Sequence, residues 1–275
     1  YGGSENGRVR GDTHVYIKGG QIGVGEGAEG AYDEDKFINP IETPVTAENV
    51  LAECAHWDYK EPFKPYDGVG ATEGGATTGS DGHSFYGNVF GGGSGYYPYK
   101  KSDNSYEWLR SAGLVEGNTN VEVTGGHILN NLYGGNEMTD VTGTCNVTMT
   151  GGTLGVPRTL EQIKNQPVCC YLFGGGKGDQ RTHFNTSTNV GKANVKVGGD
   201  AIIYGSVFGG GEDGHVLEDI NIEIQDGNNT FTVGTGENQK TYHFPIIGTT
   251  GTSYVDGNIF GGGRGFSGDA LTAGS

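Results

Sequence analysis

The sequence predicts an all-β fold: a parallel, right-handed β-helix or solenoid of about five glycine-cornered coils. Glycine supplies 55 of the 275 residues, several times its usual share of about 7%. A glycine-rich motif recurs along the chain, and a second motif with alternating apolar residues recurs between its copies. Because one such unit cannot bury its own apolar face, successive units are expected to stack.

In four of its copies the alternating motif leads into a pair of glycines and then a further apolar residue. Its copies read "HVYIKGGQI" (14–22), "NVEVTGGHI" (120–128), "NVTMTGGTL" (146–154) and "NVKVGGDAI" (194–202), with a weaker copy "INIEIQDGN" (220–228). Each predicts a short strand followed by a glycine bend. The apolar pairs keep one phase and predict one buried face, because a slip of one residue would turn them outward; they are Val15/Ile17, Val121/Val123, Val147/Met149, Val195/Val197 and Ile220/Ile222.

The glycine-rich motif begins with an aromatic residue. It reads "GNVFGGG" at 87–93 and returns as "GSVFGGG" at 205–211 and "GNIFGGG" at 257–263, with looser copies "NLYGGN" at 131–136 and "YLFGGGKG" at 171–178. Stacking of the coils predicts a structural aromatic ladder along one corner, made of Phe90, Tyr133, Phe173, Phe208 and Phe260. The glycines that follow are expected to allow positive φ and close approach between coils. The opening "YGGSENG" is a truncated copy of this motif.

The repeats predict one solenoid domain over residues 1–275, a segment of a longer array, with insertions at 28–82, 96–116 and 155–168. Within the insertions, a short helix is expected over 47–56 and another after Thr159. The insertions carry the best binding candidates, since rings mixed with polar residues form sugar platforms or protein contact surfaces. These candidates are Trp57, Tyr59, Phe63, Tyr66, Tyr96, Tyr97, Tyr99 and Trp108. The alternative is that the rings clamp the insertions onto the solenoid.

Charge and cysteine content restrict the partners. With 17 basic and 33 acidic residues the net charge is −16, which disfavours binding to nucleic acid or anionic membranes. No apolar run is long enough for a membrane-spanning helix, so membrane insertion is not expected. Two states of the four cysteines remain open: a disulfide from the Cys169–Cys170 pair to Cys54 or Cys145, or four reduced, buried thiols.

No pattern of catalytic or metal-binding residues emerges, so neither an enzyme nor a cofactor is expected. The acidic surface would permit Ca²⁺, without a motif to support it. "GGGKGDQRT" at 174–182 lacks the Ser or Thr that a phosphate-binding loop needs after Lys177. Glu212, Asp213 and His215 resemble a glycosidase cluster, but no carboxylates align beside them in the other copies, and a solvated loop is the simpler interpretation.

Two long stretches, "VEVTGGHILNNLYGGN" (121–136) and "VKVGGDAIIYGSVFGGG" (195–211), resemble the glycine-rich FGGG/YGGG-repeat β-solenoid surface proteins of gut bacteria. The resemblance covers most of the chain outside the insertions. It implies secretion and an extracellular or cell-surface structural role, and it carries no catalytic residue with it.

The expected function is therefore that of a non-catalytic structural or adhesive repeat protein, whose matched ends stack into filaments or onto neighbouring repeats. The alternative is a β-helix that binds or degrades glycans, such as a polysaccharide lyase, a hydrolase or a phage tail-spike.

Overall fold

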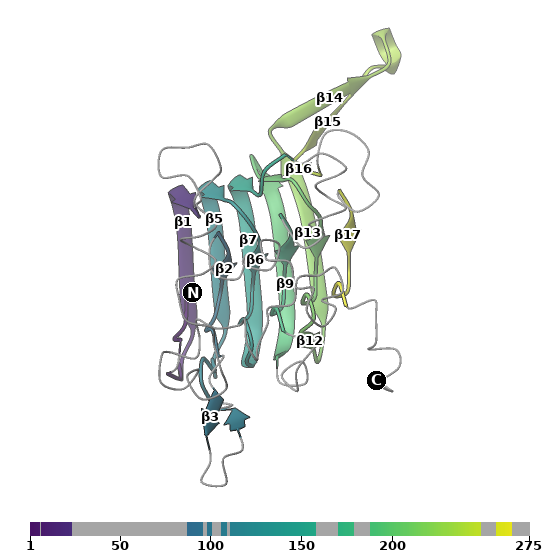
Figure 1. Cartoon of the computed structure of the whole chain (residues 1–275). Helices are drawn as coiled ribbons and strands as arrows, with labels where there is room; N and C mark the ends of the chain where they lie inside the picture. The colour runs from purple at the N-terminus through teal and green to yellow at the C-terminus, as the bar shows by residue number, and fades with distance from the viewer. Residues whose placement is uncertain are drawn as a thin grey trace, which may run out of the picture.

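A computed structural model describes residues 1–5, 7–23, 87–95, 98–100, 106–108, 111–157, 170–178, 188–248 and 257–265. These residues form an almost entirely β structure built on parallel sheets (Figure 1). The only helix among them is a single 3₁₀ turn, Gly236–Asn238. The predictions of an all-β class and of parallel pairing are thus confirmed.

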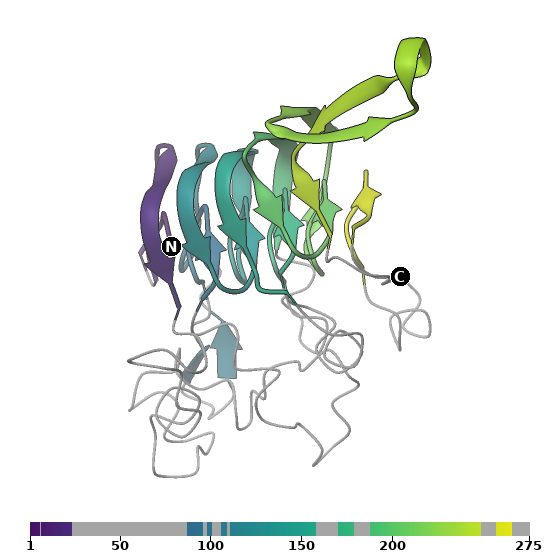
Figure 2. The ribbon, with the colours of Figure 1, turned by 90° about the horizontal axis from the view of Figure 1, so that it is seen from above.

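The first sheet contains the alternating motifs. Its long strands run parallel in chain order: β1 (Thr13–Ile22), β5 (Thr119–Ile128), β7 (Val141–Leu154), β9 (Asn189–Gly199) and β13 (Ile220–Gly227). Three two-residue strands extend it: β10 (Ile202–Ile203), β12 (His215–Val216) and β16 (Ile246–Ile247). Figure 2 shows the successive strands side by side from the N-terminal to the C-terminal end.

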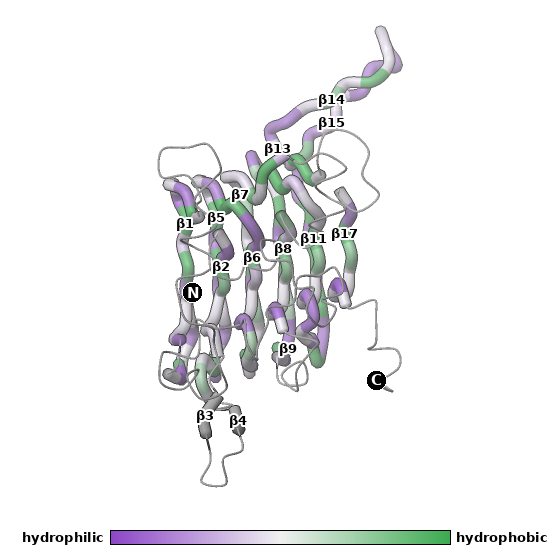
Figure 3. Tube along the Cα trace, in the orientation of Figure 1, coloured by the Kyte–Doolittle hydropathy of each residue, from purple (hydrophilic) through white to green (hydrophobic). Residues whose placement is uncertain are grey.

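The register places like residues opposite each other. Residues at equivalent positions in successive copies are called a row below. One row runs Val15, Val121, Val147, Val195 and Ile222. Apolar segments of neighbouring strands therefore lie side by side (Figure 3). The weak fifth copy keeps the predicted phase, with Ile222 paired with Val195 and Ile224 paired with Val197.

In the first three copies the glycine pair lies inside a long strand. Pairing continues past it with register shifts, as between Val123 and His127 on β5. The second glycine of the pair adopts positive φ, +86° at Gly126 and +77° at Gly152, where a β-carbon would be strained. The expectation of short strands ending in a bend is corrected for these copies, each of which is one strand of ten to fourteen residues interrupted by a bulge. In the fourth copy β9 ends at Gly199, and a turn at Asp200 leads to β10, as expected.

The second sheet contains the aromatic–glycine motifs as two-residue parallel strands: β2 (Val89–Phe90), β6 (Leu132–Tyr133), β8 (Leu172–Phe173), β11 (Val207–Phe208) and β17 (Ile259–Phe260). The first residue of each inner strand packs with the first sheet in the main core. The second residue, the ring, belongs to a separate aromatic cluster. Side chains alternate across a strand, so the second sheet separates the two clusters.

A third row runs Val9, Val115, Val141, Val190 and Val216. Its three middle members are buried together with Cys145. This row corrects the boundary of the insertion predicted at 96–116, because Ala112 and Val115 are fully buried in the stack. Earlier in that insertion, β3 (Pro98–Lys100) and β4 (Tyr106–Trp108) form an antiparallel hairpin.

One excursion was not predicted. Strands β14 (Asn229–Val233) and β15 (Lys240–Phe244) pair in an antiparallel hairpin that projects from the C-terminal side (Figures 1 and 2). The alternating stretches "NTFTV" and "KTYHF" on either side of a polar, glycine-containing turn are its sequence signal. Of the other predicted insertions, 28–82 lies outside the described residues, as does 155–168 after its first three positions. Both predicted helices lie outside them too.

Candidate functional site

The rings of the second sheet form one aromatic column. The structure stacks Phe90, Tyr133, Phe173, Phe208 and Phe260 in chain order and adds Tyr1 before them, with centroid distances between 4.7 and 5.2 Å. This spacing is close to the distance between neighbouring strands. Tyr171 packs edge-on against Phe173 and Phe208. The column is therefore a continuous second core that runs along the molecule.

The glycines after each ring permit close approach of the backbones. None of them has a positive φ in the described structure, contrary to the expectation. A β-carbon added to Gly174 would instead lie 2.1 Å from the Gly209 carbonyl oxygen and 2.8 Å from a Val195 methyl group. The motif needs glycine because the backbone of the next copy occupies the space that a side chain would fill.

The fifth residue of each motif, counted from the ring, forms a charged row. The amide N–H that follows it donates to the carbonyl of the same position one copy earlier, as in Gly178 N–H to Glu137 O at 2.7 Å and Gly265 N–H to Glu212 O at 2.8 Å. This series of bonds defines the row as Glu5, Ser94, Glu137, Lys177, Glu212 and Arg264.

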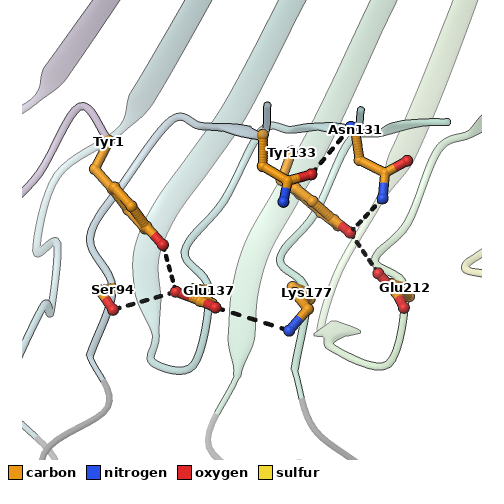
Figure 4. A network of polar contacts seen from close by, with 8 residues as sticks. Tyr1, Ser94, Asn131, Tyr133, Glu137, Lys177 and Glu212 are labelled. Carbon is orange, nitrogen blue, oxygen red and sulfur yellow. Dashed lines mark hydrogen bonds and ion pairs between the residues drawn. The ribbon is translucent and has the colours of Figure 1, made fainter. Parts of the chain in front are cut away.

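Glu137 is the most enclosed charge of this row, with 0% of the residue exposed. Its carboxylate accepts hydrogen bonds from the Tyr1 hydroxyl at 2.5 Å and the Ser94 hydroxyl at 3.2 Å, and lies 3.7 Å from Lys177 Nζ (Figure 4). A buried carboxylate requires such partners. The interaction with Glu137 also gives Lys177 a structural role.

Glu212 has a similar arrangement, two copies of the motif further along the same row. It is 2% exposed and accepts a hydrogen bond of 2.5 Å from the Tyr133 hydroxyl, which in turn accepts one from Asn131 Nδ2 at 3.1 Å (Figure 4). In both cases the tyrosine of one copy of the motif donates to the carboxylate that lies two copies further along the chain. The interpretation of Glu212 and Asp213 as a solvated loop is wrong, since Asp213 is only 6% exposed; His215 alone of the three is exposed.

The hydrogen bonds and the ion pair of this network join different copies of the motif and so hold the copies in register. Each carboxylate is enclosed and faces hydroxyl donors. Among the described residues, no group of three or more His, Cys, Asp or Glu side chains is arranged to hold a metal ion. The geometry gives Glu137 and Glu212 partners inside the protein.

Removing the Lys177 charge should weaken the fold. Lys177→Met is expected to lower the free energy of unfolding by about 1–3 kcal/mol, because Glu137 loses its cationic partner while it stays buried. Urea unfolding followed by circular dichroism measures the loss. The control is Lys196→Met: Lys196 pairs with Glu223 at 3.9 Å with both side chains well exposed, so its effect should be close to zero. Equal effects of the two variants would contradict the structural role of Lys177.

Tyr133 makes the fold sensitive to alkali. Burial, together with the Glu212 carboxylate, raises the pKa of the Tyr133 hydroxyl well above its ordinary value of 10.0. Its stabilising contribution is therefore complete below about pH 10, where an unfolded tyrosine is neutral, and is lost as the pH rises above that value. Between about pH 9 and pH 11, wild type should lose about 1 kcal/mol more than Tyr133→Phe in urea titrations. Equal losses would show that Tyr133 does not contribute.

A second ladder lies on the first sheet. Asn120, Asn146, Asn194 and Asn221 occupy one row, and each side-chain amide from Asn146 onward donates to the preceding Oδ1 at 2.9–3.1 Å. His14 holds the same position on β1, and Asn120 Nδ2 donates to the Thr13 carbonyl oxygen. This asparagine ladder has one direction along the stack.

The two ends of the stack are exposed. Phe260 and Ile259, on the last strand of the second sheet, are 44% and 48% exposed, whereas Phe173 and Leu172 in the middle are fully buried. Tyr1, at the opposite end of the aromatic column, is 55% exposed. The aromatic column is therefore exposed at both ends and buried between them.

The predicted aromatic binding residues are only partly placed. Tyr99 on β3 pairs with Glu107, and Trp108 on β4 pairs with Pro98, so one hairpin contains both candidates at neighbouring register positions. Trp57, Tyr59, Phe63, Tyr66, Tyr96 and Tyr97 lie outside the described residues.

Of the cysteines, Cys145 has a free, buried thiol whose pKa is raised by burial to about 12. The Cys170 thiol lies 3.8 Å from the Val156 carbonyl oxygen. The predicted alternative of a disulfide to Cys145 is wrong, because the Cys145 thiol is free. Cys54 and Cys169 lie outside the described residues.

Comparisons with protein-family models, curated proteins and solved structures found no match to this chain. Within the described part of the chain, no helix has the length and apolar character needed to span a membrane. The functional interpretation therefore rests on the site itself: the aromatic column, the two polar ladders and the exposed ends.

Proposed function

We propose that this chain is a right-handed parallel β-solenoid that serves as a non-catalytic structural or adhesive repeat protein and assembles end to end. One observation carries the proposal: rows that are fully buried inside the stack end in exposed residues, as Phe173 at 0% and Phe260 at 44% illustrate. Unpaired strand edges with apolar residues favour addition of further strands. A repeating chain with two such ends joins head to tail and forms filaments.

The buried carboxylates support a role without catalysis. A glycosidase needs two carboxyl groups that reach a sugar, whereas Glu137 and Glu212 are enclosed and bonded to tyrosines. The extracellular or cell-surface location rests on the resemblance of the repeats to bacterial surface proteins.

Assembly is tested with the purified 275-residue chain. Sedimentation velocity at several concentrations should show species that grow with concentration, and electron microscopy should show fibres about as wide as one chain. A single monomeric species up to high concentration would overturn the proposal. In that case the β3–β4 hairpin, which projects from the sheets with Tyr99 and Trp108 (Figure 1), favours glycan binding, and a glycan array is the next measurement.

A further inference from the structure

We propose that the join between two copies has one register, in which Arg264 of one copy lies beside Glu5 of the next. This inference rests on the proposed end-to-end assembly and specifies its partner: a second copy of this chain, in the same orientation. The argument comes from the rows, each of which ends at one face of the stack and begins at the other.

The charged row supplies charge complementarity. It begins at Glu5, which is exposed, and ends at Arg264, which is half-buried. Inside the stack, the neighbouring positions Glu137 and Lys177 bring their charges to 3.7 Å. One further step in the same row would bring Arg264 as close to the Glu5 of a following copy. A join between like ends would instead set two arginines or two glutamates together, which is repulsive.

The backbone of the second sheet continues in the same register. Along this sheet, the first glycine N–H of each motif donates to the ring residue's carbonyl in the next motif, from Gly2 N–H to Phe90 O through Gly209 N–H to Phe260 O, at 2.8–2.9 Å. The next bond in the series would run from Gly261 N–H to the Tyr1 carbonyl of a second copy. Tyr1 would then stack on Phe260, as it stacks on Phe90 at 4.8 Å within its own chain.

Gly261 provides a test of close approach. A β-carbon on the equivalent Gly134 would lie 2.2 Å from the Gly174 carbonyl oxygen, whereas one on Gly261 has no described residue within 4 Å. Gly261 is not in the positive-φ region either. A methyl group at this position is therefore harmless in a single copy and clashes only when another copy is joined.

The decisive experiment exchanges charges between copies. Arg264→Glu alone and Glu5→Arg alone should each weaken self-association, measured by sedimentation velocity at low salt, at least about tenfold. An equimolar mixture of the two variants should associate nearly as well as wild type, because every junction again joins a glutamate to an arginine. Glu122→Arg, an exposed site in the middle of the stack with the same change of charge, is the control and should associate as wild type does.

A second variant checks the backbone contact. Gly261→Ala should abolish association and leave the thermal unfolding of the monomer unchanged. If wild type associates but the charge variants and Gly261→Ala associate equally well, this register is wrong and the assembly proposal stands. If wild type does not associate at all, both proposals fail. If the single charge variants weaken association but their mixture does not restore it, the Arg264–Glu5 pairing is refuted.

Discussion

Replacing Gly174 by alanine is expected to destabilise the fold by at least about 3 kcal/mol. The new methyl group would lie 2.1 Å from the Gly209 carbonyl oxygen, far inside van der Waals contact. Gly174 cannot move away cheaply, because its N–H donates to the Phe208 carbonyl at 2.9 Å and Gly175 N–H donates to Gly210 at 3.0 Å. Relief of the clash therefore requires that the hydrogen bonds between these two copies of the motif break.

Chemical unfolding at low protein concentration measures this effect. Gly261→Ala is the matched control, since Gly261 holds the same position in the last motif and a β-carbon there has no described residue within 4 Å. Its unfolding midpoint should equal that of wild type. If the Gly174→Ala protein is as stable as Gly261→Ala, successive copies of the motif do not pack as closely as the structure shows.

Replacing Phe173 by alanine is expected to cost about 3–5 kcal/mol. Phe173 is fully buried and stacks on Tyr133 at 5.0 Å and on Phe208 at 5.2 Å, with Tyr171 against its edge. The substitution leaves a cavity in the column and removes ring pairs that contribute about 0.5–1.5 kcal/mol each beyond their burial. It also takes away a wall of the space that encloses Tyr133.

Phe260→Ala is the control for this variant. Among the described residues Phe260 stacks on Phe208 alone, and it is 44% exposed, so the loss should be a small fraction of that for Phe173→Ala. The two variants are compared by urea unfolding of monomeric protein, because association would protect Phe260. Similar losses at the two positions would contradict a column that is buried in the middle and open at its end.

Much of the fold could be predicted because alternation is a local signal. Val121 and Val147 occupy the same phase of the same motif, and the structure pairs them. The fifth copy shows the limit: its apolar run Ile220, Ile222 and Ile224 offers two alignments with the same phase, and the letters do not distinguish them. The structure selects the one that places Asn221 beneath Asn194 and aligns the two ladders of side chains.

The polar network was missed for a physical reason. Tyr1 and Glu137 are 136 positions apart, and Tyr133 and Glu212 are 79 apart. These pairs meet because each tyrosine side chain reaches across two copies of the stack. The short-range spacing of residues in the sequence does not predict such a contact. Glu212 follows three glycines in a polar stretch, so it has the appearance of a surface loop. The asparagine ladder did have a signal, since Asn120, Asn146 and Asn194 each precede an inward-facing valine.

By itself, the sequence determined the all-β class, the parallel order of the repeats and, for the first four copies, which residues belong to one row, because apolar phase and motif spacing are properties of the chain. Only the tertiary structure decided that Glu137 and Glu212 are buried, that the glycines serve close approach rather than positive φ, and that a hairpin leaves the stack after Gly227. These features depend on how closely successive copies approach one another, and that distance is set only when the copies have stacked.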